Sequence, residues 1–152
     1  MRRNLRPEDV AVLLEAPKCA VLATYRQDGT VLLSPVWHEW RDGGFTVHLG
    51  DGGVNARLLR RDPRASIVLH EDAPPYRGIE LRGQARLTTE GERDALRRIA
   101  VRYLGDREGN AYADAATWEG IVLRLEPGDL RVWDFVDEYG PDGPRDRVMP
   151  QK

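Results

Sequence analysis

The stretch Ile79-Glu80-Leu81-Arg82-Gly83-Gln84-Ala85-Arg86-Leu87 decides the fold, because apolar or small residues alternate with polar ones along its whole length. Side chains of a β-strand point to alternate faces of a sheet, so this period of two predicts a strand with one buried and one solvated face. Other segments on both sides of it are also typical of strands. They predict strands over residues 19–25, 31–40, 45–49, 65–70, 121–125 and 130–135.

The turns between several of these strands are short. Asp28-Gly29 and Asp42-Gly43-Gly44 are typical of tight hairpins, which join antiparallel neighbours. Helices are predicted after Pro7, before Pro63 and along an apolar stripe that ends at Leu104. Strands and hairpins therefore dominate the chain, with a few helices between them.

The last of these helices has a predicted start. Thr89-Glu90-Gly91-Glu92 has the pattern of a capping box, and a polar loop is predicted from the end of the helix to Thr117. The elements together predict a mainly β fold, a β-barrel with peripheral helices. Residues 1–139 are expected to form a single domain, and residues 140–152, rich in Pro, Gly and charged residues, a flexible C-terminal tail.

The composition excludes several classes of partner. The 152-residue chain has 23 Lys and Arg against 25 Asp and Glu, a net charge of −2, so no general basic field attracts nucleic acid or an acidic membrane. No segment is apolar enough to span a bilayer or to act as a secretory leader, and a cytoplasmic location is expected. The one cysteine, Cys19, lies in a strand-like run, where a buried inert thiol is expected. His38, His48 and His70 fall on three different predicted strands without metal-ligand spacing, so no metal site is expected.

Four arginines surround the end of the helix predicted before Pro63. Arg57, Arg60, Arg61 and Arg64 are spaced i, i+3, i+4 and i+7, which would place them on one helical stripe. Guanidinium groups bind phosphate and carboxylate through paired hydrogen bonds, so this stripe is suited to an anionic ligand. The alternative is a solvated basic face paired with the nearby acids Asp62, Glu71 and Asp72.

The segment from Ser34 to Trp40 is unusual for a strand. Pro35 lies inside it, and a proline within a strand indicates an edge, a bulge or an opening of the ladder. Trp37 and Trp40 fall on opposite faces, so at most one is expected in the core and the other in a cleft or an interface, with simple packing on the surface as the alternative. A large aromatic side chain beside such an opening can wall a planar ligand.

Five short motifs follow one another in a recognisable order: Leu22-Ala23-Thr24, Asp28-Gly29, Ser34-Pro35-Val36-Trp37, Arg60-Arg61-Asp62-Pro63-Arg64-Ala65-Ser66, and Pro74-Pro75-Tyr76-Arg77 leading to Gly83. In this order they resemble the pyridoxamine 5'-phosphate oxidase-like superfamily. Within it, the sequence is most similar to the flavin/deazaflavin (F420)-dependent oxidoreductases of group B, from about residue 8 to about residue 136.

The resemblance implies an FMN-binding-like split β-barrel, a homodimer with two cofactor sites at its interface. It also implies an oxidoreductase that transfers a hydride between F420 or FMN and a small organic substrate, without an essential catalytic side chain. F420 is expected first, FMN next, and FAD less. The residues implied at the cofactor are Ser34, Pro35, Val36, Trp37, His48, Leu49, Gly50, Asn55, Arg57 and Arg61, with Tyr76, Arg77 and Gly78 contributed by the partner chain.

The sequence departs from the pattern of this family in two places. Relatives usually carry a phosphate-binding lysine where this chain has Asn55, and an arginine where it has Val54. Loss of one charge-assisted contact costs about 1.5–3 kcal/mol, roughly tenfold to a hundredfold in affinity, for which Arg57 with Arg60 or Arg61 would have to compensate. Gly78 stands where an aromatic residue often follows, and a glycine there would widen the ring pocket.

Two other functions are alternatives. A non-catalytic flavin- or haem-binding protein, for storage or sensing, could use the same barrel, with His38 or His48 as the axial ligand of a haem. A nucleic-acid-binding barrel could use the arginine stripe. The balanced net charge and the absence of interleaved aromatic residues argue against nucleic acid.

Overall fold

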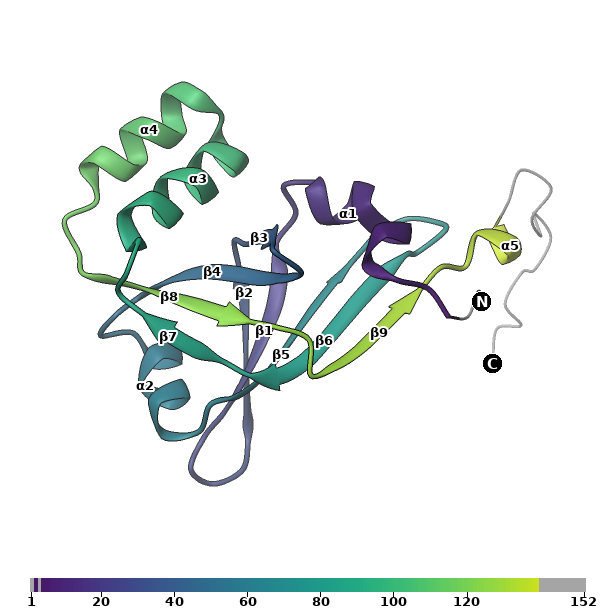
Figure 1. Ribbon diagram of the computed structural model, residues 1–152, viewed down its shortest axis with the longest axis horizontal. Coiled ribbons are helices and arrows are strands. Elements are labelled where there is room, and N and C mark those ends of the chain that lie inside the picture. The colour runs from purple at the N-terminus through teal and green to yellow at the C-terminus, as the bar shows by residue number, and fades with distance from the viewer. Residues whose placement is uncertain (1, 3, 140–152) are drawn as a thin grey trace, which may run out of the picture.

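The structure, a computed structural model, describes residue 2 and residues 4–139. Within these residues, nine strands form two antiparallel sheets (Figure 1). The first sheet has the order β2-β1-β5-β6-β9 and consists of β1 (Ala20–Tyr25), β2 (Val31–Val36), β5 (Arg64–His70), β6 (Gly78–Gln84) and β9 (Asp129–Trp133). The second has the order β3-β4-β8-β7 and consists of β3 (Glu39–Arg41), β4 (Gly44–Gly50), β7 (Arg86–Thr88) and β8 (Gly120–Leu125). The predicted tail over residues 140–152 lies outside the described residues.

The inner faces of the two sheets enclose the main hydrophobic core. Leu22, Ile67 and Leu81 from the first sheet and Phe45 and Leu123 from the second are fully buried. In the described part of the chain no ladder joins the two sheets, so hydrogen bonds do not close the barrel and it is split. The prediction of a mainly β, split-barrel fold is confirmed.

The first crossing between the sheets lies at Trp37 and His38, between β2 and β3. The prediction of one strand over residues 31–40 is therefore wrong, and so is the placement of His38 on a strand. The side chain of His38 turns inward instead and is fully buried, edge-on to the ring of Phe45 at 5.2 Å. This inward turn ends β2 and lets β3 start in the other sheet.

Another crossing lies at Ala85, between β6 and β7. The alternation over residues 79–87 predicted a single strand, but its two ends belong to different sheets. The amide of Ala85 donates to the carbonyl of Pro63 at 2.7 Å, outside both ladders. The side-chain alternation continues through the bend, which is why the break is not visible in the sequence.

The helices lie at the periphery, as predicted (Figure 1). They are η1 (Pro7–Val10, a 3-10 helix), α1 (Ala11–Glu15), α2 (Val54–Arg61), α3 (Glu92–Leu104), α4 (Asp106–Ala115) and α5 (Val136–Tyr139). Helix α3 packs on β4 and β8 of the second sheet, and α4 lies beside α3. No helix in the described residues has both the length and the apolar composition needed to cross a membrane.

Helix α4 occupies the segment for which a polar loop was predicted. It packs on α3 by close approach, because a Cβ at Gly109 would overlap the backbone of Val101. Ala113, Ala116 and Leu96 form a small core of their own between the two helices. Small residues make this interface, so the sequence has no large apolar stripe that would indicate a helix.

The predicted capping box at the start of α3 is not formed. Gly91 is the N-cap residue, with a φ of +67°, and no side chain caps the helix. The carboxylate of Glu92 is instead 2.5 Å from Nε2 of His48. The hydroxyl of Thr88 rather than that of Thr89 accepts from the amide of Glu90, at 3.1 Å. The carboxylate of Glu92 therefore bonds to His48 and does not cap the helix.

Several arginines clamp main-chain carbonyls of segments that are remote in sequence. Arg102 donates to the carbonyls of Leu14 and Ala16 at 2.5 and 2.8 Å, which ties α3 to the end of α1. Arg124 donates to the carbonyl of Asp42 at 2.7 Å and holds the turn between β3 and β4 against β8. These arginine clamps use guanidinium groups for structure, so part of the arginine content has no bearing on ligands.

Cys19 immediately precedes β1 and is exposed. The prediction of a buried thiol is wrong, because the strand starts one residue later, at Ala20.

Candidate functional site

A hollow of about 530 Å³ lies between α2 and the β1–β2 hairpin. Its walls come from the outer face of α2 and from the residues that follow β1: Arg26, Gln27, Asp28, Val54, Arg57, Leu58 and Arg61. We call it the arginine hollow. The turn Gly50-Asp51-Gly52-Gly53 leads from β4 into α2, with the amide of Gly53 donating to the carbonyl of Gly50 at 3.0 Å. It is a strand-to-helix turn.

Three arginines line the hollow: Arg26, which donates to the carbonyl of Val31 at 3.4 Å, and Arg57 and Arg61, which lie one helical turn apart on α2. Arg61 donates through Nη2 to the carbonyl of Tyr25 at 2.7 Å, which fixes its direction. Arg57 is exposed, and its guanidinium has no hydrogen-bond or ion-pair partner among the described residues. The carboxylate of Asp28 accepts from the amide and the hydroxyl of Thr30, and these bonds lower its pKa. The acid in the hollow is thus engaged within its own turn, and a guanidinium remains available for an anion.

The other two arginines do not face the hollow. Arg60 pairs with Asp51 at the start of α2. Arg64 is the first residue of β5, beyond the helix, and pairs with Asp62 at 2.7 Å. Hydrogen bonds from Arg64 lower the pKa of Asp62 to about 2. The prediction of one stripe formed by all four arginines is therefore wrong. Arg57 and Arg61 line a hollow. Arg60 and Arg64 are paired with acids at the surface, as in the alternative interpretation.

Asn55 links two strands beside the arginine hollow. Its Oδ1 accepts from the hydroxyl of Thr24 on β1 at 2.9 Å, and its Nδ2 donates to Oγ of Ser34 on β2 at 3.0 Å. Thr24 is fully buried, and β2 is the edge strand of its sheet. The structure thus brings together Ser34 and Asn55, which the sequence predicted, and Thr24, which it did not. A polar residue at an inward position of β1 was the available signal for Thr24.

The two tryptophans of the segment from Ser34 to Trp40 face different surroundings. Trp40 packs against the core, edge-on to Phe45 at 5.0 Å. Trp37 stacks on Tyr103 of α3 with ring centroids 4.9 Å apart and planes inclined by 7°. Pro35 is exposed, while Val36 packs against the core. Trp37 therefore lies against α3, away from α2.

The end of β4 contributes differently from what was predicted. His48 points to α3, where it meets Glu92, and the two side chains are only 7% and 11% exposed. Leu49 belongs to the core. A Cβ at Gly120 would overlap both His48 and Glu92, so a glycine is required beside this pair. Of the three predicted residues, only Gly50 borders the start of α2.

The segment Tyr76–Gly78 lies at the start of β6, which is separated from β2 by β5 and β1. Arg77 sits between Glu71 and Asp134, at 3.8 Å from each carboxylate. The predicted widening at Gly78 is wrong, because the indole of Trp133 occupies the space where a side chain would lie. Within one chain this segment does not reach the arginine hollow.

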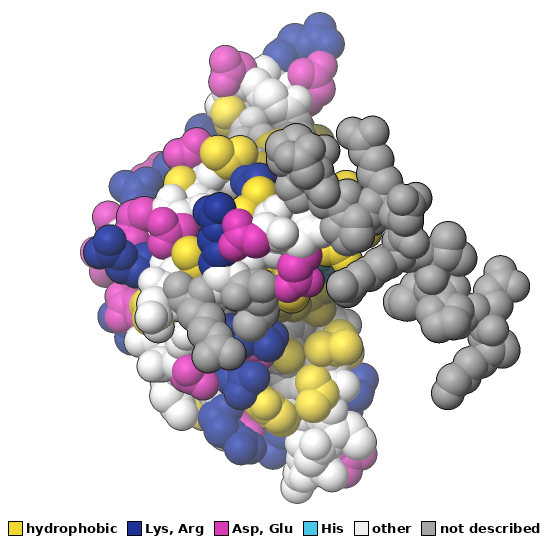
Figure 2. All heavy atoms as spheres, turned by 90° about the vertical axis from the view of Figure 1, so that its right-hand side faces the viewer, with side chains coloured by type: hydrophobic (Ala, Val, Ile, Leu, Met, Phe, Trp, Pro, Cys, Tyr) yellow, Lys and Arg dark blue, Asp and Glu magenta, His cyan; other side chains and the backbone are white. Residues whose placement is uncertain are grey.

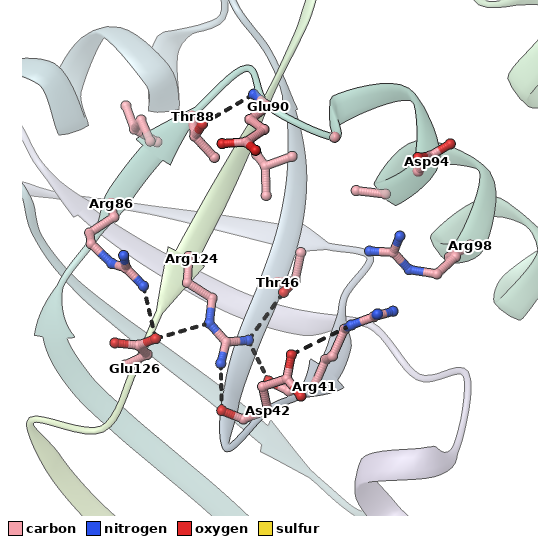
Figure 3. A pocket seen from close by; sticks show the side chains of 14 residues that line it. Arg41, Asp42, Thr46, Arg86, Thr88, Glu90, Asp94, Arg98, Arg124 and Glu126 are labelled. Atoms are coloured by element: carbon pink, nitrogen blue, oxygen red, sulfur yellow. Dashed lines mark hydrogen bonds and ion pairs between the residues drawn. The ribbon is translucent and has the colours of Figure 1, made fainter.

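A second hollow of about 580 Å³ lies between α3 and strands β4, β7 and β8 (Figure 3). Arg124 crosses its floor, and Glu126 accepts from Arg86 at 2.8 Å (Figure 3). None of the residues implied at the cofactor lines it. Because its arginines are largely engaged by carbonyls and carboxylates of the chain, we place the candidate site at the arginine hollow.

The comparisons with known proteins agree with this fold. Residues 7–133 match the pyridoxamine 5'-phosphate oxidase family. The chain belongs to this family. No curated protein matches the sequence.

Solved structures of related fold include the conserved hypothetical protein Rv2991 from Mycobacterium tuberculosis, 26% identical over 89% of each chain with a TM-score of 0.74. An F420 reductase is 20% identical, covering 79% of this chain and 94% of the other, with a TM-score of 0.64. HutZ, the haem storage protein from Vibrio cholerae, is 19% identical, covering 87% and 95%, with a TM-score of 0.65. The latter two show the shared fold.

In this member of the pyridoxamine 5'-phosphate oxidase family, the residues implied at the cofactor form two groups. Ser34, Asn55, Arg57 and Arg61 lie on or beside α2, near the arginine hollow. Gly50 borders the start of the same helix. The others lie elsewhere in the same chain: Pro35 exposed on β2, Val36 and Leu49 against or in the core, Trp37 and His48 against α3, and Tyr76, Arg77 and Gly78 at the start of β6.

Proposed function

We propose that this protein binds F420 or FMN, with the phosphate in the arginine hollow, and acts as an oxidoreductase on a small organic substrate. The observation that carries the proposal is Arg57, exposed and unengaged, one turn from Arg61 beside a hollow of about 530 Å³. Ligand pockets usually measure about 300–1,000 Å³, and arginine forks fit phosphate oxygens in pairs. F420 comes first and FMN second. The likeness in fold to an F420 reductase supports this order.

The residues beside the hollow fit the phosphate of either cofactor without a lysine. Arg57 and Arg61 would bind the phosphate, and the hydroxyl of Ser34 would donate to an oxygen of the cofactor. When bound, the cofactor supplies hydride transfer, so the protein has to bind and orient it and to exclude water. No catalytic acid or base is assigned: Nε2 of His48 is engaged by Glu92, and burial lowers the pKa of His38 to about 4, so its ring is neutral.

A homodimer is part of this proposal. The outer face of β2 and β1 exposes apolar side chains, with Val31 45% and Leu33 64% exposed and Pro35 beside them. Figure 2, a view from the end that carries β9, shows hydrophobic side chains gathered toward one side and charged ones over the other. Pairing of two copies would bury the β1–β2 face and could bring Tyr76–Gly78 of one chain to the cofactor of the other. A cytoplasmic location also belongs to the proposal.

The test is a titration of the purified protein with F420, FMN, FAD and haem, followed by fluorescence or absorbance. Binding of F420 or FMN, together with turnover of the reduced cofactor, is the expected result. If neither F420 nor FMN binds below about 100 µM, roughly −5.5 kcal/mol, the proposed function is refuted.

A non-catalytic haem-binding function is the second candidate, supported by the likeness in fold to HutZ. The structure disfavours its predicted axial ligands, since His38 is fully buried and His48 is 7% exposed. A Soret band that survives substitution of both residues would point to His70, whose side chain is 53% exposed.

A further inference from the structure

We propose that Thr24 is a positioning residue of the cofactor site: acting through Asn55, it orients the hydroxyl of Ser34 as a hydrogen-bond donor to an oxygen of the bound cofactor. The inference rests on the proposed function and adds a residue and a role to it. We call Thr24, Asn55 and Ser34 the relay.

The first step concerns the orientation of the Asn55 amide. Thr24 is fully buried, and a buried hydroxyl must donate its hydrogen or lose a hydrogen bond. Among the described residues, Oδ1 of Asn55 at 2.9 Å is its acceptor. An amide turned by 180° would present Nδ2 to Thr24 and leave the hydroxyl hydrogen without an acceptor. The buried threonine therefore selects one orientation of the amide.

The second step follows from that orientation. With Oδ1 directed to Thr24, Nδ2 points to Ser34 and donates to its Oγ at 3.0 Å. The serine hydroxyl is thereby an acceptor on one side, and its own hydrogen is free to donate. No described side chain or carbonyl accepts it, and Ser34 lies half-buried on the edge strand β2.

The third step concerns location. Asn55 lies in the first turn of α2, whose outer face carries Arg57 and Arg61 into the arginine hollow. The same helix thus presents two charges for phosphate and one amide that directs a neutral donor. A donor whose direction is set before binding costs less entropy on binding, so the relay contributes to affinity through pre-organisation.

The first experiment uses the protein without cofactor and follows the side-chain amide protons of Asn55 by NMR. Their exchange with solvent should be slow in the wild type and at least about tenfold faster in Thr24→Val, which keeps the shape and removes the donor. Thr24→Ser should restore slow exchange. Thr117→Val, the same change at an exposed threonine, is the matched control and should have no effect.

The second experiment measures the dissociation constants of FMN and F420. Thr24→Val and Ser34→Ala should each weaken binding about tenfold, because each would weaken or remove the hydrogen bond from the Ser34 hydroxyl to a charged or polarised oxygen of the cofactor. The double variant should bind no more weakly than Ser34→Ala alone, because both changes break one relay. Thr24→Ser should bind within about threefold of the wild type.

The outcomes separate the inference from the proposed function. If the cofactor binds and the two substitutions weaken binding additively, or Thr24→Val lowers only the melting temperature, the relay is refuted while the proposed function stands. If the wild type binds neither FMN nor F420, the proposed function fails, and the cofactor role of Thr24 fails with it. Amide exchange that Thr24→Val does not change overturns the inference in either case.

Discussion

The buried imidazole of His38 makes the stability of this protein sensitive to mild acid. The ring is fully buried, edge-on to Phe45 and Tyr103 at 5.2 and 6.3 Å, and neither ring nitrogen has a hydrogen-bond partner among the described residues. Burial, helped by the nearby charge of Arg102, lowers the pKa of His38 from 6.5 to about 4. Protonation is therefore opposed in the folded state and free in the unfolded state.

The sign and size of the effect follow from this difference. Well above pH 6.5 the ring is neutral in both states and the full stability is present. As the pH falls from 6.5 to 4, His38 becomes protonated in the unfolded chain but stays neutral in the folded chain, so the free energy of unfolding decreases. A difference of about 2.5 pH units corresponds to at most about 3 kcal/mol, of which about 2 kcal/mol is lost between pH 7.5 and pH 5.

Urea denaturation at pH 7.5, 6 and 5 would measure this loss in the wild type and in His38→Leu. The variant has no proton to gain, so its free energy of unfolding should fall by about 2 kcal/mol less than that of the wild type over this range. His70→Gln, at an exposed histidine, is the control and should follow the wild type. Equal pH dependence in His38→Leu and the wild type would refute the reasoning, whatever the stability of the variant at pH 7.5.

Three further predictions concern the site, the assembly and the core. Arg57→Gln should weaken binding of FMN or F420 about tenfold to a hundredfold in a fluorescence titration, because one charge-assisted phosphate contact is lost. Leu33→Asp should convert a dimer into monomers in analytical ultracentrifugation, since it places a charge on the exposed apolar face of β2. Gly120→Ala should reduce the free energy of unfolding by about 1–3 kcal/mol, because the methyl group would overlap the buried pair of His48 and Glu92.

Each of these predictions has a matched control. Arg60→Gln removes an equal charge from α2 at a residue that pairs with Asp51, and cofactor affinity should change little. Val12→Asp places a charge on an apolar residue that is 74% exposed on α1, and the dimer should persist. Gly52→Ala adds a methyl group where no atom lies within 4 Å, and stability should hold. Equal effects in variant and control would contradict the respective explanation.

The strands and the arginine helix could be predicted because their signals are local. Alternation along β6 and the Asp28-Gly29 turn each depend on residues close in sequence. The sheet crossing at Ala85 could not, because the alternation passes through the bend while the chain changes sheet. Helix α4 was missed for a related reason. It packs on α3 at Gly109, which has no side chain, so the contact produces no apolar periodicity in the sequence.

The residues of the candidate site also fall into those that local spacing predicts and those that depend on contacts distant in sequence. Arg57 and Arg61 were predicted, because their spacing on one helix is sufficient to place them together. The bond between Thr24 and Asn55 spans 31 residues, and the pair of His48 and Glu92 spans 44, so neither could be read from spacing. Competition also mattered, since the carboxylate of Glu92 had a local capping role available and bonds the distant histidine instead.

The arginine clamps carry a consequence for the order of events in folding. Arg102 reaches a carbonyl 88 residues away in sequence, and Arg124 reaches one 82 residues away. Contacts of such separation close long loops, so we expect them to form after the rate-limiting barrier, once the sheets have assembled. Replacing Arg102 or Arg124 by lysine should then leave the refolding rate nearly unchanged and accelerate unfolding. In that case the clamps determine how long the native state lasts rather than how quickly it is reached.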